Sequence, residues 1–204
     1  LTEDAFVGRL KLPPTRLDNL RATSISESAI SLAWDDLSTI EDGFIVERKT
    51  GSTGSWAQVA SLGANVTTYN NSGLSEATSY YYRVKAYNNA GTSAFSNELN
   101  VLTTPAAPVN LTAEAVNERK VNLTWQDKSS GEEGFRVERK TSGSNWRTIA
   151  TLAANVIIYS DTSVTETTTY TYRVFAFNAS GDSASSNEAS VTTPALTVPA
   201  APSA

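Results

Sequence analysis

Residues 43–50 read Gly-Phe-Ile-Val-Glu-Arg-Lys-Thr, and residues 134–141 repeat this stretch as Gly-Phe-Arg-Val-Glu-Arg-Lys-Thr, with one change in eight positions. The surrounding sequence recurs in the same order, so that Trp34, for example, corresponds to Trp125. A repeat of about 90 residues is too long for a solenoid unit and has the size of a small independent domain. The sequence therefore predicts two domains of one fold, arranged in tandem.

Short segments in each repeat alternate apolar and polar side chains. Ile30, Leu32 and Trp34 alternate with smaller or more polar neighbours, and turn-forming clusters such as residues 50–54 and 70–73 separate the segments. A period of two is typical of antiparallel strands that are buried on one face, and no segment shows the period of a helix. With about seven such segments in each repeat, we expect an all-β protein made of two seven-stranded β-sandwiches.

The alternation also assigns side chains to the two faces of the strands. We expect one set to point into the core of the first domain: Phe44, Val46, Tyr80, Tyr82, Val84 and Ala86. We expect the intervening set to point outward: Ile45, Glu47, Tyr81, Arg83, Lys85 and Tyr87. Glu47 and Arg83, like Glu138 and Arg173, should then face each other as exposed ion pairs that contribute about 0–1 kcal/mol each.

Each repeat resembles a fibronectin type III domain. The resemblance rests on a Trp in the second strand, the repeated Gly-Phe-x-Val-Glu-Arg block, and the pattern Tyr-x-Tyr-Arg-Val-x-Ala-x-Asn that begins at Tyr80 and at Tyr170. Leu74 with Tyr80, and Val164 with Tyr170, stand where this family has its tyrosine corner. The block is most similar to repeats of secreted and surface proteins of bacteria and archaea. The resemblance implies two immunoglobulin-like sandwiches and an extracellular or cell-surface location.

Domain boundaries follow from where the repeated pattern starts and stops. We expect an N-terminal extension over residues 1–14, fibronectin type III domains over residues 15–105 and 106–194, and a Pro- and Ala-rich tail over residues 195–204. Residues 196–202 match residues 102–108, which join the two repeats, at six of seven positions. The tail therefore resembles an inter-domain linker that leads into a further repeat.

The N-terminal extension has no counterpart in the second repeat. It contains the apolar residues Phe6, Val7, Leu10 and Leu12, in a pattern that allows a strand. The edge of a sandwich offers unpaired backbone groups that a strand from another chain can complete. We therefore expect these residues to form an inter-subunit segment whose protein partners are other copies of the chain.

The composition argues against several classes of function. The chain of 204 residues has no His, Cys or Met, so the usual catalytic bases, thiol nucleophiles and soft metal ligands are missing. Its net charge of −5 argues against a nucleic-acid partner, and no apolar run reaches the roughly 20 residues needed for membrane insertion.

Acidic residues cluster in the same turn of both repeats: Asp35, Asp36, Glu41 and Asp42, and Asp127, Glu132 and Glu133. Such turn residues are usually solvated, so we expect no enzyme, no cofactor and no metal.

Four aromatic residues lie on the predicted outward face, beside Arg and Lys: Tyr81, Tyr87, Phe175 and Phe177. Exposed aromatic side chains suit contact with a protein or stacking on sugar rings. The alternative, which we favour, is cross-strand packing that stabilises the sheet. Trp56 and Trp146 recur at one hairpin of each repeat, which indicates that they cover an edge of the core.

Three functions are compatible with these observations. The first is a non-catalytic structural or interaction protein of the extracellular space, in its sharper form a subunit of a surface filament joined through its terminal segments. The second is a spacer or accessory binding module of a larger secreted enzyme, such as a polysaccharide hydrolase. The third is an adhesin module that binds sugars or proteins through the aromatic face. We rank the first highest, because the extension and the tail are not explained by the repeated fold.

Overall fold

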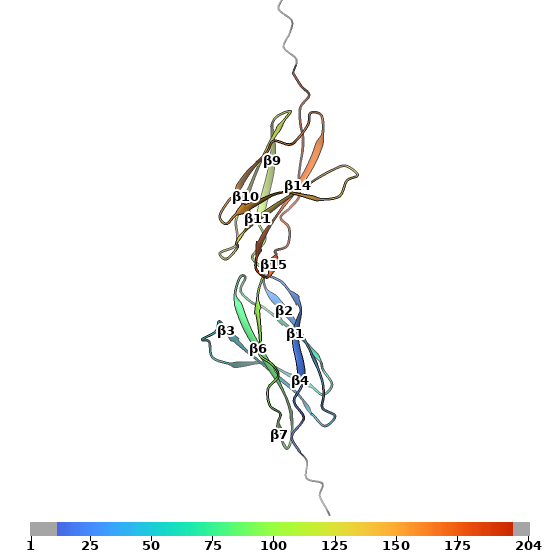
Figure 1. Ribbon diagram of the computed structural model, residues 1–204, viewed down its shortest axis with the longest axis vertical. Coiled ribbons are helices and arrows are strands. Elements are labelled where there is room, and N and C mark those ends of the chain that lie inside the picture. Colours follow the sequence, from blue (N-terminus) through green and yellow to red (C-terminus); the bar gives the residue numbers. More distant parts are fainter. Residues whose placement is uncertain (1–11, 198–204) are drawn as a thin grey trace, which may run out of the picture. The chain divides into compact units, whose positions relative to one another are not determined.

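The computed structural model describes residues 12–197, which form two compact units: residues up to 74 with 78–103, and residues 75–77 with those from 104 onward. The described residues form the strands β1 to β16 and no helix (Figure 1), so they contain no helix that could cross a membrane. The predicted all-β class is confirmed. Phe6, Val7 and Leu10 of the expected inter-subunit segment lie outside the described residues.

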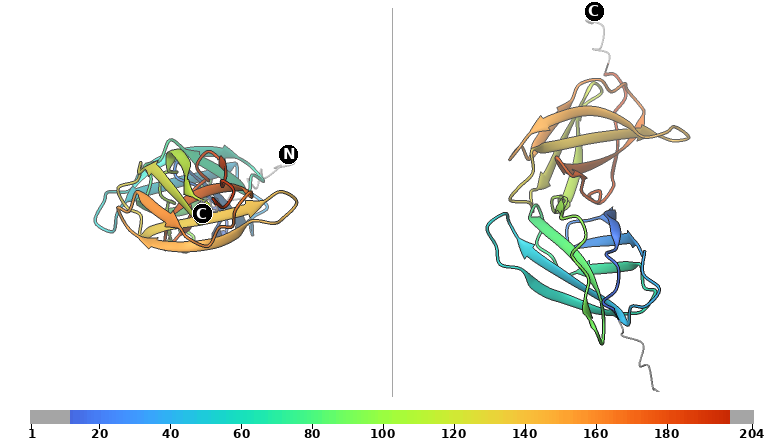
Figure 2. Two further views of the ribbon diagram at one scale, coloured as in Figure 1. Left: turned by 90° about the horizontal axis from the view of Figure 1, so that it is seen from above. Right: turned by 60° about the horizontal axis from the view of Figure 1, so that its bottom comes forward.

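Two antiparallel sheets build the first domain. The smaller sheet has the order β1-β2-β5 and consists of β1 (Asp18–Ile25), β2 (Ala29–Asp35) and β5 (Thr68–Ser72). The larger sheet has the order β4-β3-β6-β7, with β8 also paired to β6, and consists of β3 (Gly43–Thr50), β4 (Ala57–Gly63), β6 (Ser79–Asn88), β7 (Gly91–Thr92) and β8 (Leu99–Leu102). Figure 2 shows that the two sheets of a domain pack face to face.

The second domain repeats this arrangement. Its smaller sheet, in the order β13-β10-β9, consists of β9 (Val109–Asn117), β10 (Lys120–Gln126) and β13 (Ile158–Asp161). Its larger sheet, in the order β12-β11-β14-β15 with β16 also paired to β14, consists of β11 (Gly134–Thr141), β12 (Arg147–Ala153), β14 (Thr169–Asn178), β15 (Gly181–Asp182) and β16 (Ala189–Thr192).

The last strand position of each sandwich is interrupted. In the first domain β7 and β8 pair with opposite ends of β6, so together they fill one position. Between them, the hydroxyls of Ser93 and Ser96 accept hydrogen bonds from the backbone N–H groups of Ala86 and Val84, at 2.9 and 3.1 Å. The two serine hydroxyls therefore bind backbone N–H groups of β6 at positions where no strand pairs with it. Each domain thus has the predicted seven strand positions.

The core of each domain lies between its two sheets. All six side chains that alternation assigned to the interior of the first domain are at most 4% exposed. Trp34 packs against Phe44 with ring centres 5.7 Å apart, and Trp125 packs against Phe135 at the same distance. Tilted aromatic pairs of this kind add about 0.5–1.5 kcal/mol to the free energy gained from burial. The prediction that these six side chains point into the core is therefore confirmed.

The predicted tyrosine corner is present in the second domain. The Tyr170 hydroxyl accepts a hydrogen bond of 3.0 Å from the backbone N–H of Thr165, and Val164 is buried beside it in the same core. In the first domain Leu74 and Tyr80 are likewise buried in one core. The corner fixes the loop that enters β14 to the body of the sandwich.

Candidate functional site

Cations stack on aromatic rings over the outward face of the larger sheet of the first domain. The Arg83 guanidinium lies 4.2 Å from the ring centre of Trp56 and 3.8 Å from that of Phe95. The Lys49 ammonium extends the stack, at 4.9 Å from the Trp56 ring and 4.8 Å from the Tyr81 ring. Such contacts contribute about 0.5–1 kcal/mol each at exposed sites. Much of the aromatic surface on this face is therefore already in contact with cations of the same domain.

The second domain carries the same kind of stack. The Arg173 guanidinium lies 4.2 Å from the ring centre of Trp146 and 5.0 Å from that of Phe175. Lys140 contacts the Trp146 ring at 4.2 Å, and Arg136 contacts the Phe175 ring at 4.9 Å. Neither Trp56 nor Trp146 is among the residues that form or line the two cores. The expectation that they cover a core edge is wrong, because alternation places their cationic partners on the outward face.

A glutamate pairs with the central arginine of each stack. Glu47 lies opposite Arg83 in the ladder, with the Arg83 Nη2 atom 2.6 Å and the Lys85 Nζ atom 3.2 Å from its carboxylate. In the second domain Arg173 lies 2.7 Å from the Glu138 carboxylate. Burial alone would raise the pKa of Glu47, but hydrogen bonds from Arg83 and Lys85 outweigh it and lower the pKa. Both predicted pairs are confirmed, although they are half-buried and not exposed.

Tyr87 and Phe177 cover glycines on the neighbouring strand. Tyr87 lies directly opposite Gly43 and Phe177 opposite Gly134. A Cβ atom on Gly43 would come within 2.8 Å of the Tyr87 hydroxyl, and one on Gly134 within 2.9 Å of the Phe177 ring. The rings thus occupy the space that a side chain at either glycine would need. This packing explains why the repeated block begins with glycine.

The expected aromatic interaction face is consequently less accessible than the sequence indicated. Tyr81, Tyr87, Phe175 and Phe177 are all half-buried. Tyr81 and Phe175 contact cations, and the other two pack over glycines. Their assignment to partner binding stays a prediction, and the structure shows a packing role for each.

The acidic turns bind backbone N–H groups of neighbouring loops. In the first domain Glu41 accepts from Asn65 at 3.3 Å and Asp42 accepts from Asn89 at 3.1 Å. In the second domain Glu132 accepts from Asn155 and Glu133 from Ala179, both at 3.1 Å. Residues 12–197 contain no group of three or more Asp, Glu, His or Cys side chains that could hold a metal ion. These carboxylates hold loops together at one end of each sandwich.

A buried polar cluster distinguishes the two domains and was not predicted. In the second domain the Asp161 side chain is 1% exposed, and its carboxylate lies 2.6 Å from Arg139 Nη1. It also accepts hydrogen bonds from the Tyr172 hydroxyl at 3.0 Å and from the hydroxyl of Ser163 at 2.7 Å. In the first domain the neutral Asn71 takes this place. The sequence signal that could have revealed the cluster is an Asn-to-Asp difference at an inward position of the repeat.

The stability of the second domain should therefore fall in acid. Burial alone would raise the pKa of Asp161, but hydrogen bonds from Ser163 and Arg139 outweigh it, and the pKa is lowered from its ordinary value of 3.8. A lowered folded-state pKa contributes stability that is complete above the unfolded value and is lost as the pH falls through the folded value. We expect Asp161→Asn to lose less stability than the unmodified chain between about pH 5 and pH 2. Unfolding by urea across this range measures the difference, and equal losses would contradict it.

Comparison with known proteins is consistent with this architecture. The sequence model of the family described as "Fibronectin type III domain" matches residues 12–102 and 106–192. The netrin receptor DCC of Homo sapiens is 27% identical over 194 residues, which are 89% of this chain and 13% of that protein. Chitinase A1 of Niallia circulans is 31% identical over 208 residues, which are 90% of this chain and 26% of that protein. The chain thus spans no more than about a quarter of either relative.

A solved structure has the same fold. The two-domain fibronectin type III segment of chicken tenascin superposes with a TM-score of 0.53 at 14% identity, over 87% of this chain and 99% of that one. The relatives include animal and bacterial proteins, so the bacterial or archaeal kind of repeat stays a prediction. The family match covers most of the chain and agrees with both sandwiches, and we conclude that the chain belongs to the fibronectin type III domain family.

Proposed function

We propose that this chain is a non-catalytic interaction module of an extracellular or cell-surface protein. We further propose that it associates with other copies of itself through one end of its first domain. The observation that carries the proposal is a group of apolar side chains at that end, which we call the N-terminal apolar patch: Leu12, Leu37 and Ile40, which are 62%, 60% and 44% exposed. Exposed apolar groups that gather in one place are typical of surfaces that bind proteins.

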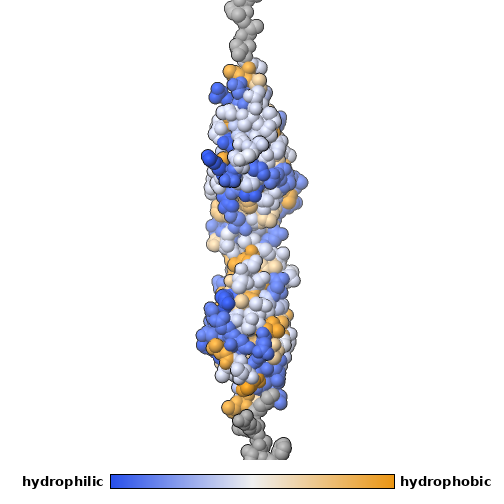
Figure 3. All heavy atoms as spheres, turned by 90° about the vertical axis from the view of Figure 1, so that its right-hand side faces the viewer, coloured by the Kyte–Doolittle hydropathy of each residue, from blue (hydrophilic) through white to orange (hydrophobic). Residues whose placement is uncertain are grey.

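Hydrogen bonds bring the three residues of the patch together. The Asn88 side-chain amide donates to the backbone oxygen of Leu12 at 2.9 Å and to that of Ile40 at 3.1 Å. The Thr15 hydroxyl donates to the backbone oxygen of Leu37 at 2.7 Å. The first domain therefore holds all three segments at the place where the chain enters it. Figure 3 shows apolar surface, coloured orange, on the lower domain of that view.

The fold itself does not require apolar side chains in the patch. In the second repeat Lys128 stands in the position of Leu37, and Gly131 stands in that of Ile40. The sandwich forms with either set, so the patch is an addition to the first domain. Leu12 is also one of the residues of the expected inter-subunit segment, which makes a second copy the partner that we propose.

To test the proposal, residues of the patch are replaced by those that stand at the same positions in the second repeat. The double variant Leu37→Lys with Ile40→Gly should keep the fold and abolish self-association, and so should removal of residues 1–12. The matched control is Ile158→Thr, because Ile158 is 64% exposed and the first repeat has Thr68 in its place. Multi-angle light scattering at increasing protein concentration measures the mass. Association that is unchanged in the double variant or in the shortened chain would contradict the proposed surface.

A second candidate function is an accessory module of a secreted polysaccharide hydrolase. The observation that favours it is the similarity of this chain to two bacterial enzymes. One is Chitinase A1, and the other is Exoglucanase B of Cellulomonas fimi, which is 29% identical to this chain over 204 residues. In both proteins the matched region is at most 26% of the length. Coding sequence for a hydrolase domain beside this region would support the second candidate, and its absence on both sides would exclude it.

A further inference from the structure

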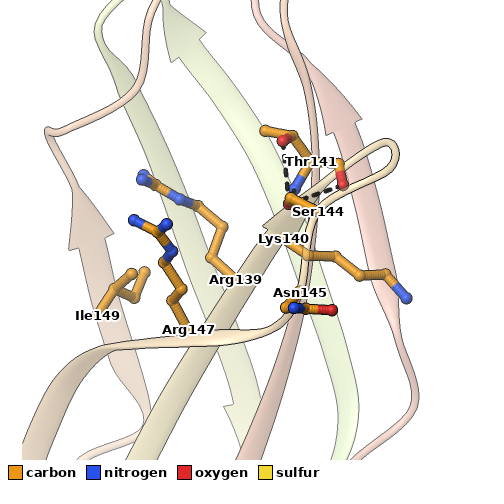
Figure 4. A pocket seen from close by; sticks show the side chains of 7 residues that line it. All are labelled: Arg139, Lys140, Thr141, Ser144, Asn145, Arg147 and Ile149. Carbon is orange, nitrogen blue, oxygen red and sulfur yellow. Dashed lines mark hydrogen bonds between the residues drawn. The ribbon is translucent and has the colours of Figure 1, made fainter.

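A cavity of about 300 Å³ lies at the hairpin that joins β11 and β12 of the second domain. It is lined by side chains of both strands and of the turn between them: Arg139, Lys140, Thr141, Ser144, Asn145, Arg147 and Ile149. The volume is at the lower end of the range found for sites that bind small ligands. Figure 4 shows that Arg139 and Arg147 extend to the same side of the hairpin, while Lys140 extends to the other.

The two arginines form a like-charge pair. Arg139 and Arg147 lie directly opposite each other in the ladder of β11 and β12. Like charges in this position destabilise a sheet. The charge of Arg139 is balanced by Asp161 at 2.6 Å, but Arg147 makes no ion pair with any residue between 12 and 197. One guanidinium group at the cavity therefore has no anionic partner within its own domain.

Comparison of the repeats shows that the fold does not need Arg147. In the first domain Arg48 lies opposite Ala57 at the same place in the ladder. The core residues around this hairpin are otherwise of the same kind in both domains, with Val59 and Ile149 each packed against its core. The second domain has thus gained an uncompensated cation beside a cavity.

One polar side chain beside Arg147, that of Asn145, is available to a ligand. The side-chain amide of Asn145 makes no hydrogen bond within the described part of the chain. The Ser144 hydroxyl is already engaged within the turn, because it accepts from the N–H and the hydroxyl of Thr141 at 2.8 and 3.1 Å and donates to the Thr141 backbone oxygen at 3.0 Å (Figure 4). A guanidinium group binds carboxylate or sulfate in a two-pronged geometry, and a side-chain amide can bind a ring hydroxyl beside it.

We propose that this cavity binds one sugar residue of an acidic polysaccharide. Arg147 binds the carboxylate or sulfate of that residue, and the side-chain amide of Asn145 binds one of its hydroxyl groups. The apolar side chain of Ile149 contacts the carbon face of the sugar ring. The site does not involve the N-terminal apolar patch, so it stands or fails separately from the self-association proposed above.

The test is calorimetric titration of the full chain with a galacturonate oligosaccharide, a dextran sulfate oligosaccharide, a neutral cello-oligosaccharide and inorganic sulfate. We expect binding of at least one acidic oligosaccharide, weaker binding at higher salt, and no binding of the neutral one. Whichever acidic sugar binds more tightly identifies carboxylate or sulfate as the recognised group. Arg147→Ala should weaken binding about tenfold or more, because it removes a charge-assisted contact.

The matched control is Arg119→Ala, which removes the same charge from an exposed turn of the same domain. It should leave binding unchanged. Arg147→Ala should not lower the melting temperature, since it removes a like-charge pair, so a loss of binding cannot be ascribed to unfolding. The proposal is overturned if no acidic oligosaccharide binds or if both Ala variants weaken binding equally. It is also overturned if inorganic sulfate binds as tightly as the sugars, which would indicate an adventitious ion only.

Discussion

Replacing Asp161 with alanine is expected to destabilise the second domain by about 3–5 kcal/mol, the cost of removing one partner from a buried ion pair. The Asp161 carboxylate is 1% exposed and lies 2.6 Å from the Arg139 guanidinium. It also accepts hydrogen bonds from the Tyr172 hydroxyl and from Ser163. The variant leaves the half-buried Arg139 guanidinium without its anionic partner and the buried Tyr172 hydroxyl without its acceptor.

Asp161→Asn is the matched control, because the first domain places Asn71 in the same position. There the Asn71 oxygen accepts from Arg48 and from Tyr82, both at 2.9 Å. The asparagine should keep these two contacts and lose the two bonds that Asp161 accepts from the N–H and the hydroxyl of Ser163, at a cost of about 1–3 kcal/mol. Urea-dependent hydrogen exchange of β14 peptides measures the second domain, and the first domain serves as an internal reference. Equal costs for the two variants would show that the charge and its contacts do not stabilise the cluster.

Replacing Gly43 with alanine is expected to destabilise the first domain by about 1–3 kcal/mol, as overpacking does. The new Cβ atom would overlap the backbone oxygen of Leu62 and lie 2.8 Å from the Tyr87 hydroxyl. The Leu62 oxygen belongs to the neighbouring strand β4 and cannot move without distorting the ladder. The ring of Tyr87 would have to leave its place over Gly43, which removes its packing contact as well.

Gly63 provides a control in the same ladder. It lies directly opposite Gly43, and a Cβ atom added to it would meet nothing within 4 Å. Gly63→Ala should be neutral or stabilise the domain by about 0.4–1 kcal/mol, because it restricts the unfolded chain. Urea-dependent hydrogen exchange of β6 peptides compares the two variants. A Gly43→Ala chain that is as stable as Gly63→Ala would mean that Tyr87 does not depend on the glycine.

The fold could be predicted from the sequence because its signals are local and occur twice. Alternation along β3 and β6 identified the buried side chains, such as Phe44 and Tyr82, which are 0% exposed. The same alternation placed Glu47 opposite Arg83, and the ladder has this register. Because the alternating pattern occurs in both repeats, the inward and outward positions assigned in one domain can be compared with those assigned in the other.

The surface features could not be predicted in the same way, because they depend on contacts between segments far apart in the chain. The sequence indicated that Trp56 covers an edge of the core, but it lies under Lys49 and Arg83, which come from different strands. The Asn-to-Asp difference at Asp161 marks an inward position that changes between the repeats, but it does not identify Arg139 as the partner. Alternation gives the face of a strand on which a side chain lies, and it does not give the partner that the side chain meets there.

The most direct test of the proposed interaction module is sedimentation velocity of the unmodified chain over a range of concentrations up to about 1 mM, which detects weak association. If copies associate through the N-terminal apolar patch, the weight-average mass will rise with concentration above the 21.8 kDa of one chain. A mass of 21.8 kDa at every concentration would contradict self-association through this surface.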